Sequence, residues 1–208
     1  MADRPVPNLL GLAVLGVLAQ RPMHRYEIAT TIHQQGKGDE LAIRWGSLYT
    51  VVKNLERHGF VEATGTERAG ARPERTTYRI TTAGRREMAD WTRDLLRSPA
   101  REHPRFTAGL SMIGALPPDE VAGLLRERLA HLEAGLAADR ADLARWSADV
   151  PRLFLLEDEY ALALQQAEAD WVRGLLGELE GGTLPGLDAW RAQHAGATAT
   201  EEVTPEQP

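Results

Sequence analysis

The stretch from Ala42 to Arg79 constrains the fold of this chain more than any other, because an amphipathic helix pattern leads directly into two strand-like segments. In GSLYTVVKNLERHG, apolar residues recur at i, i+3, i+4 and i+7, which predicts one buried helix face: Leu48, Val51, Val52 and Leu55. The segments FVEAT and TTYRIT that follow have the β-branched and aromatic content of strands, and glycine, proline and arginine lie between them. We therefore predict a helix from near Gly46 to Gly59, followed by a β-hairpin.

Two more helices are predicted before this stretch. Asn8 is a candidate N-cap for LLGLAVLGVLAQR, whose apolar residues nearly surround the helix, as expected of a segment that is buried on most sides. After the turn RPMH, the segment RYEIATTIHQQ has a helical apolar stripe, and Gly36 provides a C-terminal stop. Three helices and then an arginine-bearing hairpin, in this order, are typical of a winged helix-turn-helix domain that binds double-stranded DNA.

The third helix and the hairpin carry groups suited to DNA. The face opposite the apolar stripe has donors for phosphates or base edges: Ser47, Thr50, Lys53, Asn54 and Arg57. Arginines that could reach phosphate or a narrow minor groove lie on or beside the hairpin tip: Arg68, Arg72 and Arg75. A solvated helix face and an arbitrary polar loop are the competing interpretations. Tyr49 borders the apolar stripe, so a packed tyrosine with its hydroxyl at the rim is as compatible with the pattern as a phosphate contact.

The net charge of −6 argues against a nucleic-acid partner until its distribution is considered. Arg44 to Arg101 has 12 basic and 7 acidic residues, whereas Glu102 to Pro208 has 8 basic and 19 acidic ones. The basic excess therefore coincides with the predicted helix and hairpin and begins at Arg44, a further candidate for DNA contact. An acidic second half is compatible with this interpretation, because like charge keeps that half away from phosphate.

The chain beyond the hairpin is predicted to be helical. Thr82 is a candidate cap for a linker helix that extends to Arg97, and SPAREHPR then breaks the pattern and indicates a domain boundary. A short apolar helix from Phe106 precedes Pro117-Pro118-Asp119-Glu120, which is typical of a helix N-terminus. A coiled-coil-like seam follows, interrupted only at Asp139: Leu125, Leu129, Leu132, Leu136, Leu143 and Trp146. The same spacing resumes after Val150-Pro151 and predicts a second long helix that pairs with the first: Leu153, Leu156, Tyr160, Leu164, Ala167, Trp171 and Leu175.

The predicted fold is thus mainly α. A winged helix-turn-helix domain (α+β) spans residues 1–97 and includes the linker helix 82–97. An antiparallel helical domain for dimerisation or effector binding spans residues 105–180. The remainder, residues 181–208, is small, polar and acidic and is expected to be a flexible tail, in which Trp190 is the exception that could dock on the helices or on a partner.

No catalytic or metal-binding constellation is apparent in the sequence. The six histidines are scattered without an HExxH pattern, and the glycines of GLAVLG follow no predicted strand. The absence of cysteine excludes disulfides, thiolate zinc sites and a cysteine nucleophile. We therefore expect no enzyme activity, no catalytic residues, no metal and no cofactor. No apolar run approaches the roughly 18 residues of a membrane span, so we expect no membrane association and a cytoplasmic location.

Three segments resemble the PadR family of transcriptional regulators: LLGLAVLGVLAQRPMHRYEI, WGSLYTVVKNLERHGFVE and YRITTAGRREM. The resemblance covers roughly the first hundred residues, and the spacing from Gly-Ser-Leu-Tyr to Leu-Glu-x-x-Gly-Phe-Val is its most specific part. The family usually has a glycine where this chain has Arg25 and a proline where it has Thr50. Neither departure removes a charge or disturbs the apolar helix face.

The resemblance implies a bacterial, homodimeric DNA-binding regulator, most often a repressor, that reads a palindromic operator and is released by a small hydrophobic or aromatic effector. It places Ser47, Tyr49 and Lys53 near DNA, Tyr26 near the phosphate backbone, and Arg72 and Arg75 on the wing. Aromatic residues in the helical region are candidates to line an effector pocket, although such residues are more often core: Trp91, Trp146, Tyr160 and Trp171. The alternative function is a helical interaction adaptor whose winged domain binds protein rather than DNA.

Overall fold

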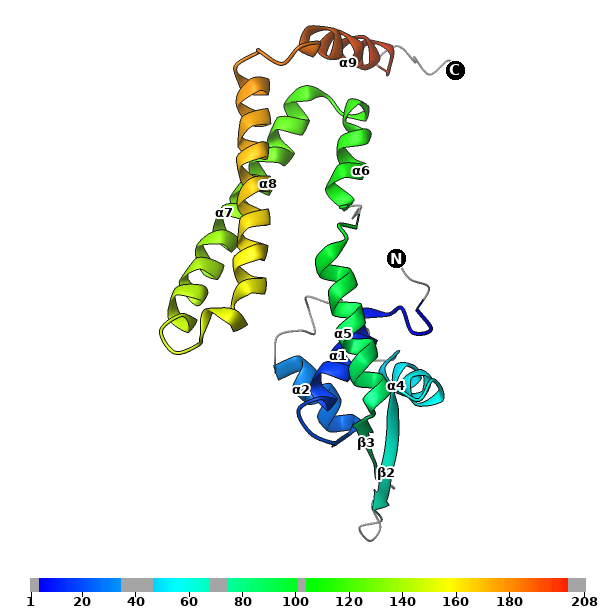
Figure 1. The fold of residues 1–208 in the computed structure, drawn as a ribbon. Helices are drawn as coiled ribbons and strands as arrows, with labels where there is room; N and C mark the ends of the chain where they lie inside the picture. The colour runs from blue at the N-terminus through cyan, green and yellow to red at the C-terminus, as the bar shows by residue number, and fades with distance from the viewer. Residues whose placement is uncertain (1–3, 35–46, 68–74, 101–103, 202–208) are drawn as a thin grey trace. The chain divides into compact units, whose positions relative to one another are not determined.

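The computed structural model describes residues 4–34, 47–67, 75–100 and 104–201, and the chain divides into two units, Met1–Glu102 and His103–Pro208. The described elements of the first unit are α1 (Leu9–Leu18), β1 (Met23–His24), α2 (Arg25–Gln34), α4 (Leu48–Arg57), β2 (Val61–Glu67), β3 (Arg75–Ile80) and α5 (Thr82–Arg97) (Figure 1). Those of the second unit are α6 (Arg105–Ser111), η2 (Ile113–Ala115), α7 (Pro118–Trp146), η3 (Arg152–Phe154), α8 (Leu156–Glu180) and α9 (Leu187–Glu201). The mainly helical fold with a small antiparallel sheet is as predicted.

The first unit closes around a single apolar core. Helix α1 is buried on most sides, as its composition predicts, and Val14 and Leu15 are fully buried. The apolar face of α4 also packs inward, since Val52 and Leu55 have no exposed surface. Because each fully buried aliphatic side chain contributes about 1.5–3 kcal/mol, this core is the main source of the unit's stability. It holds α4 with its opposite face outward.

The sheet has three strands in the order β1-β3-β2, all antiparallel. Strands β2 and β3 form the predicted hairpin, which is longer than expected because β2 passes through a bulge after Ala63 and includes Gly65. Strand β1 was not predicted, since the segment RPMH was interpreted as a turn. Its two residues are too few to show an alternating pattern, and it forms only because Met23 lies opposite Tyr78 of β3.

Side-chain caps fix the ends of two helices in the first unit. Asn8 caps α1 as predicted, and its side-chain oxygen accepts a hydrogen bond from the backbone N–H of Leu10 at 2.9 Å. For α5 the predicted cap, Thr82, is wrong by one residue. Thr81 is the cap, because its hydroxyl oxygen accepts from the N–H of Gly84 and also donates to the carbonyl oxygen of Gly59 at 2.7 Å.

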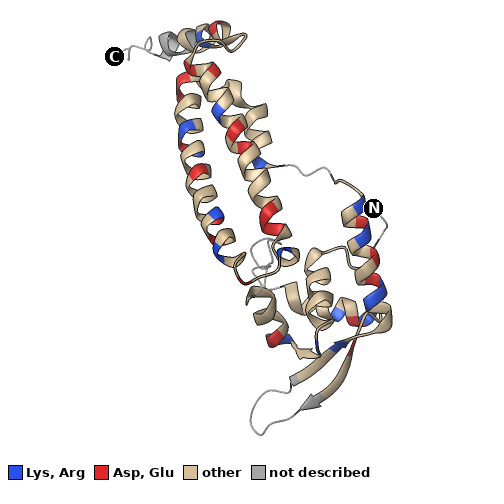
Figure 2. Ribbon diagram, turned by 60° about the vertical axis from the view of Figure 1, so that its left-hand side comes forward, with Lys and Arg blue, Asp and Glu red and all other residues tan. Residues whose placement is uncertain are grey.

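In the second unit, α7 and α8 are long and lie side by side (Figures 1 and 2). The predicted seam of α7 is partly confirmed, since Leu125 and Leu136 are buried, whereas Trp146 is 40% exposed. Asp139, the polar interruption, accepts a hydrogen bond from Gln165 of α8 at 3.0 Å. The helix α8 forms as predicted, but it buries a different face from the one expected.

The buried residues of α8 are Ala169, Val172, Leu176 and Leu179. The predicted seam residues are largely exposed instead, with Tyr160 at 66%, Leu164 at 53% and Trp171 at 51%. Helical spacing alone did not distinguish the two apolar faces, because both recur at steps of three and four residues. The second unit therefore keeps one apolar stripe of α8 on its surface.

Part of the region expected to be a flexible tail is helix α9. Leu187 at its start is buried in the core of the second unit. Trp190 packs against the same core, and its indole N–H donates a hydrogen bond to the carbonyl oxygen of Leu116 at 3.0 Å. The expectation of a flexible tail was wrong for residues 187–201, because composition does not show that a core is available for Leu187 to pack against. The packing of Trp190 agrees with its expected docking on the helices. Residues 202–208 lie outside the described residues.

No helix in the described ranges is long and apolar enough to cross a membrane.

Candidate nucleic-acid interface

Helix α4 presents a polar face opposite the one that it buries. Leu48, Val51, Val52 and Leu55 point into the core, and the helix repeat then places the side chains of Tyr49, Thr50 and Lys53 outside, where all three are exposed. Ser47 is half-buried at the N-cap position. Gly59, with φ of 72°, turns the chain from the end of α4 into β2. The helix and hairpin thus belong to one closed unit whose outer helix face is available to a partner.

Some of the predicted DNA-binding residues are exposed on this surface, whereas others are half-buried or lie outside the described residues. Tyr26 on α2 is 77% exposed and Tyr49 is 50% exposed. Asn54 is half-buried, and its side-chain oxygen accepts a hydrogen bond from Arg57 at 2.6 Å. Arg75 begins β3, and its backbone pairs with that of Glu67. Three predicted contacts fall outside the described residues: Arg44, Arg68 and Arg72.

An arginine that the sequence analysis did not select lies beside Tyr49. The guanidinium carbon of Arg25, the first residue of α2, is 4.5 Å from the centroid of the Tyr49 ring and 5.9 Å from that of Tyr78 on β3. The ammonium nitrogen of Lys53 is 5.0 Å from the Tyr49 ring centroid. Side chains from α2, α4 and β3 therefore form one group, which we call the tyrosine–cation cluster: Arg25, Tyr49, Lys53 and Tyr78.

Hydrogen bonding within the cluster changes the acidity of two of its members. The hydrogen bond with Lys53 lowers the pKa of the Tyr49 hydroxyl, and Arg25 contributes in the same direction. The same bond with Tyr49 raises the pKa of Lys53. Lys53 therefore stays cationic at neutral pH, and the surface around Tyr49 carries two positive charges.

The two cations of the cluster differ from several arginines of the first unit that form ion pairs. Arg4 pairs with Glu87 and Asp94, Arg79 pairs with Glu62 at 2.6 Å, and Arg21 pairs with Glu27 at 3.2 Å. Among the described residues, no carboxylate forms an ion pair with Arg25 or Lys53. A surface with two cations that no described carboxylate pairs with, together with exposed hydroxyls, is suited to a polyanion such as the phosphate backbone of a nucleic acid.

Sequence reasoning missed Arg25 because the interaction depends on three elements that are far apart in the chain. The one available signal was its departure from the glycine that the resembled family usually has at this place. That departure showed that this position differs from the family pattern, but it did not show which side chains the guanidinium contacts.

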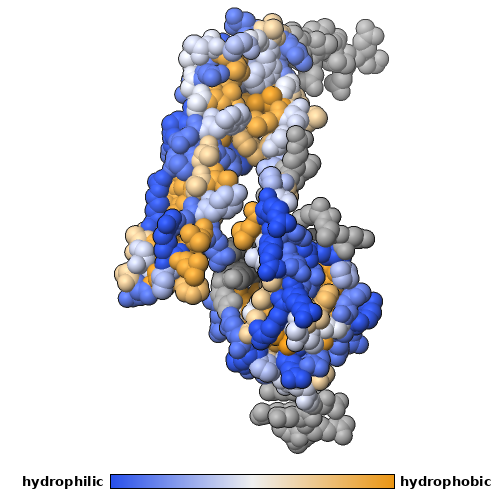
Figure 3. All heavy atoms as spheres, in the orientation of Figure 1, coloured by the Kyte–Doolittle hydropathy of each residue, from blue (hydrophilic) through white to orange (hydrophobic). Residues whose placement is uncertain are grey.

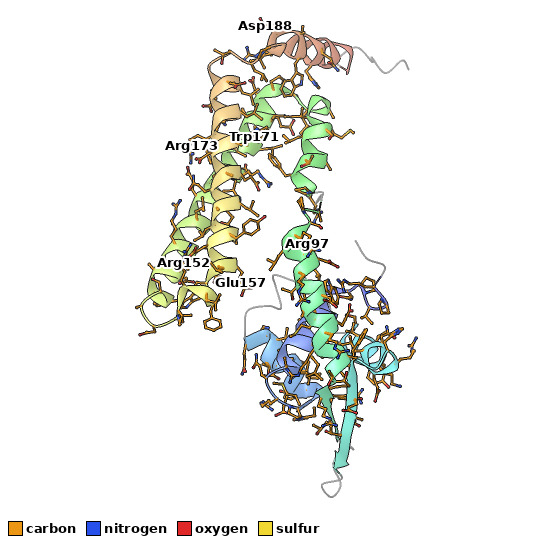
Figure 4. The ribbon with its side chains drawn as sticks, in the orientation of Figure 1. Arg97, Arg152, Glu157, Trp171, Arg173 and Asp188 are labelled. Carbon is orange, nitrogen blue, oxygen red and sulfur yellow. The ribbon has the colours of Figure 1, made fainter. Side chains whose placement is uncertain are left out.

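The predicted effector residues are divided between the two units. Trp91 is only 3% exposed, lies in the first unit and packs beneath the guanidinium of Arg4 at 5.3 Å. Trp146, Tyr160 and Trp171 belong to the second unit, where Trp171 meets Phe106 of α6 edge-on at 5.9 Å. Figure 4 shows Trp171 on the side of α8 next to α6. The burial of Trp91 supports a structural role for that residue.

Two surface hollows in the second unit contain none of these aromatic residues. One lies where α7 ends and α8 begins and is lined by residues that include Leu143, Val150 and Leu155. The other runs along α7 and is lined by residues that include Leu124, His131 and Leu132. Among the described residues, no group of three or more histidine, aspartate or glutamate side chains is arranged to hold a metal ion.

Comparison with known proteins connects this geometry to a family. Residues 14–90 match the family described as "Transcriptional regulator PadR-like family". No curated protein matches the chain.

Solved structures with a similar fold include Bacillus subtilis PadR in complex with operator DNA, at 21% identity and a TM-score of 0.68, covering 82% of this chain and 99% of that one. They also include Bacillus subtilis PadR in complex with p-coumaric acid, at 20% identity and a TM-score of 0.68, covering 83% and 99%. The Vibrio cholerae virulence activator AphA is similar at 20% identity and a TM-score of 0.59, covering 83% and 98%. The likeness therefore extends over both units and establishes the fold.

Proposed function

We propose that the chain, whose residues 14–90 match the PadR-like family of transcriptional regulators, is a sequence-specific regulator of transcription that binds double-stranded DNA. The proposal rests on the outer face of α4, where Tyr49, Thr50 and Lys53 are exposed. The apolar face of the same helix is buried in the core. A helix held in this way inside a three-helix winged unit can enter a major groove without disturbing its own packing. The operator complex of Bacillus subtilis PadR, which has this fold, supports the proposal.

In the proposed complex, residues of α4 divide between base edges and phosphates. Thr50, Lys53 and Ser47 would lie closest to the groove, because they occupy the N-terminal half of the helix on its outer side. Tyr26, 77% exposed on α2, would donate to the phosphate backbone. The arginines of the hairpin would extend the contact into the neighbouring groove or backbone: Arg68, Arg72 and Arg75.

We propose that the chain binds DNA as a homodimer and that the second unit provides the interface. The exposed stripe of α8, consisting of Leu156, Tyr160, Leu164 and Trp171, is separate from the face that packs in the core. Leu153 and Phe154 of η3 continue it, at 71% and 66% exposed. Large contiguous apolar patches mark interaction sites, and a second copy of this chain offers a self-complementary surface. Two recognition helices would then read a palindromic operator whose half-sites are roughly 34 Å apart.

We further propose that the regulator is a repressor whose release depends on a small hydrophobic or aromatic effector. Bacillus subtilis PadR, which has a similar fold, has been solved with p-coumaric acid. Such a ligand would act by favouring one spacing of the two recognition helices, since only a difference in affinity between two states shifts their balance. The exposed aromatic residues of the second unit are the candidates to contact it: Trp146, Tyr160 and Trp171.

A mobility-shift assay with the intergenic DNA beside the chain's own gene tests the proposal. The full-length protein is expected to give a complex that depends on an inverted repeat and weakens steeply as salt is raised. Lys53→Ala and Thr50→Ala are expected to weaken this complex, and Arg72→Ala with Arg75→Ala to weaken binding to all sequences.

Arg97→Ala is the matched control, because Arg97 is exposed at the end of α5, away from the hairpin (Figure 4). Equal binding by wild type and every variant would overturn the site assignment. A protein that ignores this DNA and captures a protein partner through the winged unit would support the adaptor function instead.

A further inference from the structure

Arg25 is placed where α2, α4 and β3 meet, and none of the contacts proposed above includes it. Its guanidinium lies over the ring of Tyr49, at 4.5 Å, and near the ring of Tyr78, at 5.9 Å. Tyr78 is 4% exposed and is fixed in the sheet, whereas Tyr49 stands on the exposed side of α4. Two rings thus define the position of the arginine. The ring of Tyr78 is held by the core, and the ring of Tyr49 borders the proposed DNA surface.

Stacking of this kind, together with the hydrogen bond to the Tyr49 hydroxyl, orders the arginine and leaves other N–H groups of its guanidinium for a further acceptor. The attraction between the cation and the ring acts through the face of the planar guanidinium, while its N–H groups point outward from the edge. The guanidinium is also weakly hydrated compared with an ammonium group, so less water has to be removed when it meets an anion. An arginine held between aromatic rings is therefore ready to donate to a phosphate.

Two positive charges lie close together around Tyr49, and this favours the binding of an anion. Arg25 and Lys53 both lie within about 5 Å of one ring centroid, so their positive charges repel each other. Glu27, the nearest acidic residue in sequence, is occupied by His24 and Arg21. In the described parts of the first unit, no acidic side chain hydrogen-bonds Arg25 or Lys53. A phosphodiester between Arg25 and Lys53 would relieve the repulsion.

We propose that Arg25 is a backbone-phosphate contact of the DNA complex, held in place by Tyr49 and Tyr78. The inference rests on the proposed function and adds a residue to it. Because phosphates carry no base identity, Arg25 strengthens binding to every sequence alike and fixes how α2 sits beside the groove. Lys53, whose ammonium nitrogen is 5.0 Å from the Tyr49 ring centroid, belongs to the same cluster.

Two substitutions separate the charge of Arg25 from its stacking. Arg25→Gln keeps a planar group over the Tyr49 ring and removes the charge, whereas Arg25→Lys keeps the charge and removes the planar group. Binding of the full-length protein is measured by fluorescence anisotropy over a range of salt concentrations. The two duplexes are the intergenic DNA beside its gene and a shuffled sequence of equal length. Arg97→Ala serves as the control for loss of an arginine elsewhere in the unit.

Each phosphate contact contributes about 0.9 to the slope of log affinity against log salt. Arg25→Gln is therefore expected to reduce the slope by about 0.9 per subunit on both duplexes, while Arg25→Lys and Arg97→Ala keep the wild-type slope. The ratio of affinities for the two duplexes is expected to stay unchanged in Arg25→Gln.

A wild-type slope in Arg25→Gln, even with a lowered melting temperature, would overturn the inference and assign Arg25 a packing role. A fall in the ratio between duplexes would overturn it in favour of base reading. If the wild-type protein binds neither duplex, the proposed function itself fails, which is a different result from the loss of Arg25's role alone.

Discussion

The two units differ in how completely each buries its own apolar residues. In the winged unit, the exposed large hydrophobic side chains of α2 and α4 are Tyr26 and Tyr49, which also carry hydroxyls, and Leu96 near the end of α5 is 84% exposed. In the helical unit, hydrophobic side chains gather on the surface along α8, as Figure 3 shows, and Leu164 is 53% exposed. The winged unit thus presents tyrosines on the outer sides of α2 and α4, whereas the helical unit presents a stripe of apolar side chains along α8. This contrast is the physical reason for proposing DNA contact by one unit and self-association by the other.

The charge of the two units follows the same division. Met1–Glu102 has 16 basic and 12 acidic residues, a balance of +4, whereas His103–Pro208 has 8 basic and 18 acidic residues, a balance of −10. In the helical unit the basic residues are mostly engaged by acidic neighbours (Figure 2), as in the pairs Arg126–Glu180 at 2.7 Å and Arg173–Glu133 at 2.8 Å. In the described part of the winged unit, no carboxylate forms an ion pair with Arg25 or Lys53. The repulsion between phosphate and the acidic unit would help orient the protein on DNA.

The largest expected effect comes from placing a charge on the exposed stripe of the helical unit. Leu164→Glu would put a carboxylate into the proposed dimer interface, where burial without a partner is costly. We expect the protein to become a monomer by light scattering and its affinity for operator DNA to fall by roughly 100-fold or more, because the second half-site no longer binds in the same event.

Gly177→Glu is the matched control on the same helix. Gly177 is exposed outside the stripe, and a Cβ built there meets no atom within 4 Å. This variant is expected to remain dimeric. A monomeric wild type, or a dimeric Leu164→Glu variant, would contradict the contrast between the two units.

The second prediction tests the closed packing of the winged unit. A Cβ added at Gly84 would overlap the carbonyl oxygen of Phe60 and press on Ile80, so Gly84→Ala is expected to destabilise this unit by about 1–3 kcal/mol. Hydrogen exchange of the full chain should show lost protection in residues 1–102 and unchanged protection in residues 104–180. Gly16→Ala in α1 is the control, since no atom lies within 4 Å of a Cβ there and the change favours the helix. Uniform loss of protection in both units would show that the two are not independent.

The smallest effect is expected at the end of the helical unit. Trp190→Phe keeps an aromatic ring against the core and removes the hydrogen bond to the Leu116 carbonyl oxygen, which would cost about 1 kcal/mol. Limited proteolysis should then cut sooner near α9 while leaving α7 and α8 intact. An unchanged cleavage rate would mean that the indole N–H does not hold this helix in place.

The sequence predicted those parts of the fold that depend on local spacing. The buried face of α4, the cap at Asn8 and the length of α7 follow from periodicity and from residues within a few positions. The hairpin followed from composition, although β2 continues beyond its expected end at Thr64.

What the sequence did not predict depends on distant partners. Strand β1 exists because Met23 meets Tyr78, and α9 is ordered against a core formed by α7 and α8. Helix α8 has two apolar faces, and periodicity alone favoured the one that the structure leaves exposed. In the candidate site, Lys53 and Tyr49 were chosen from the outer face of one helix, whereas Arg25 required the arrangement of three elements.

We propose that the winged unit binds DNA and that the helical unit joins two copies. A footprint of the full-length protein on the DNA upstream of its own gene tests both parts in one measurement. We expect two protected segments related by an inverted repeat, with centres about one helical turn apart, or roughly 34 Å. We also expect that the Leu164→Glu variant protects neither segment at a protein concentration where the Gly177→Glu variant protects both. Protection of a single segment that is unaffected by Leu164→Glu, or no protection at all, would contradict the account.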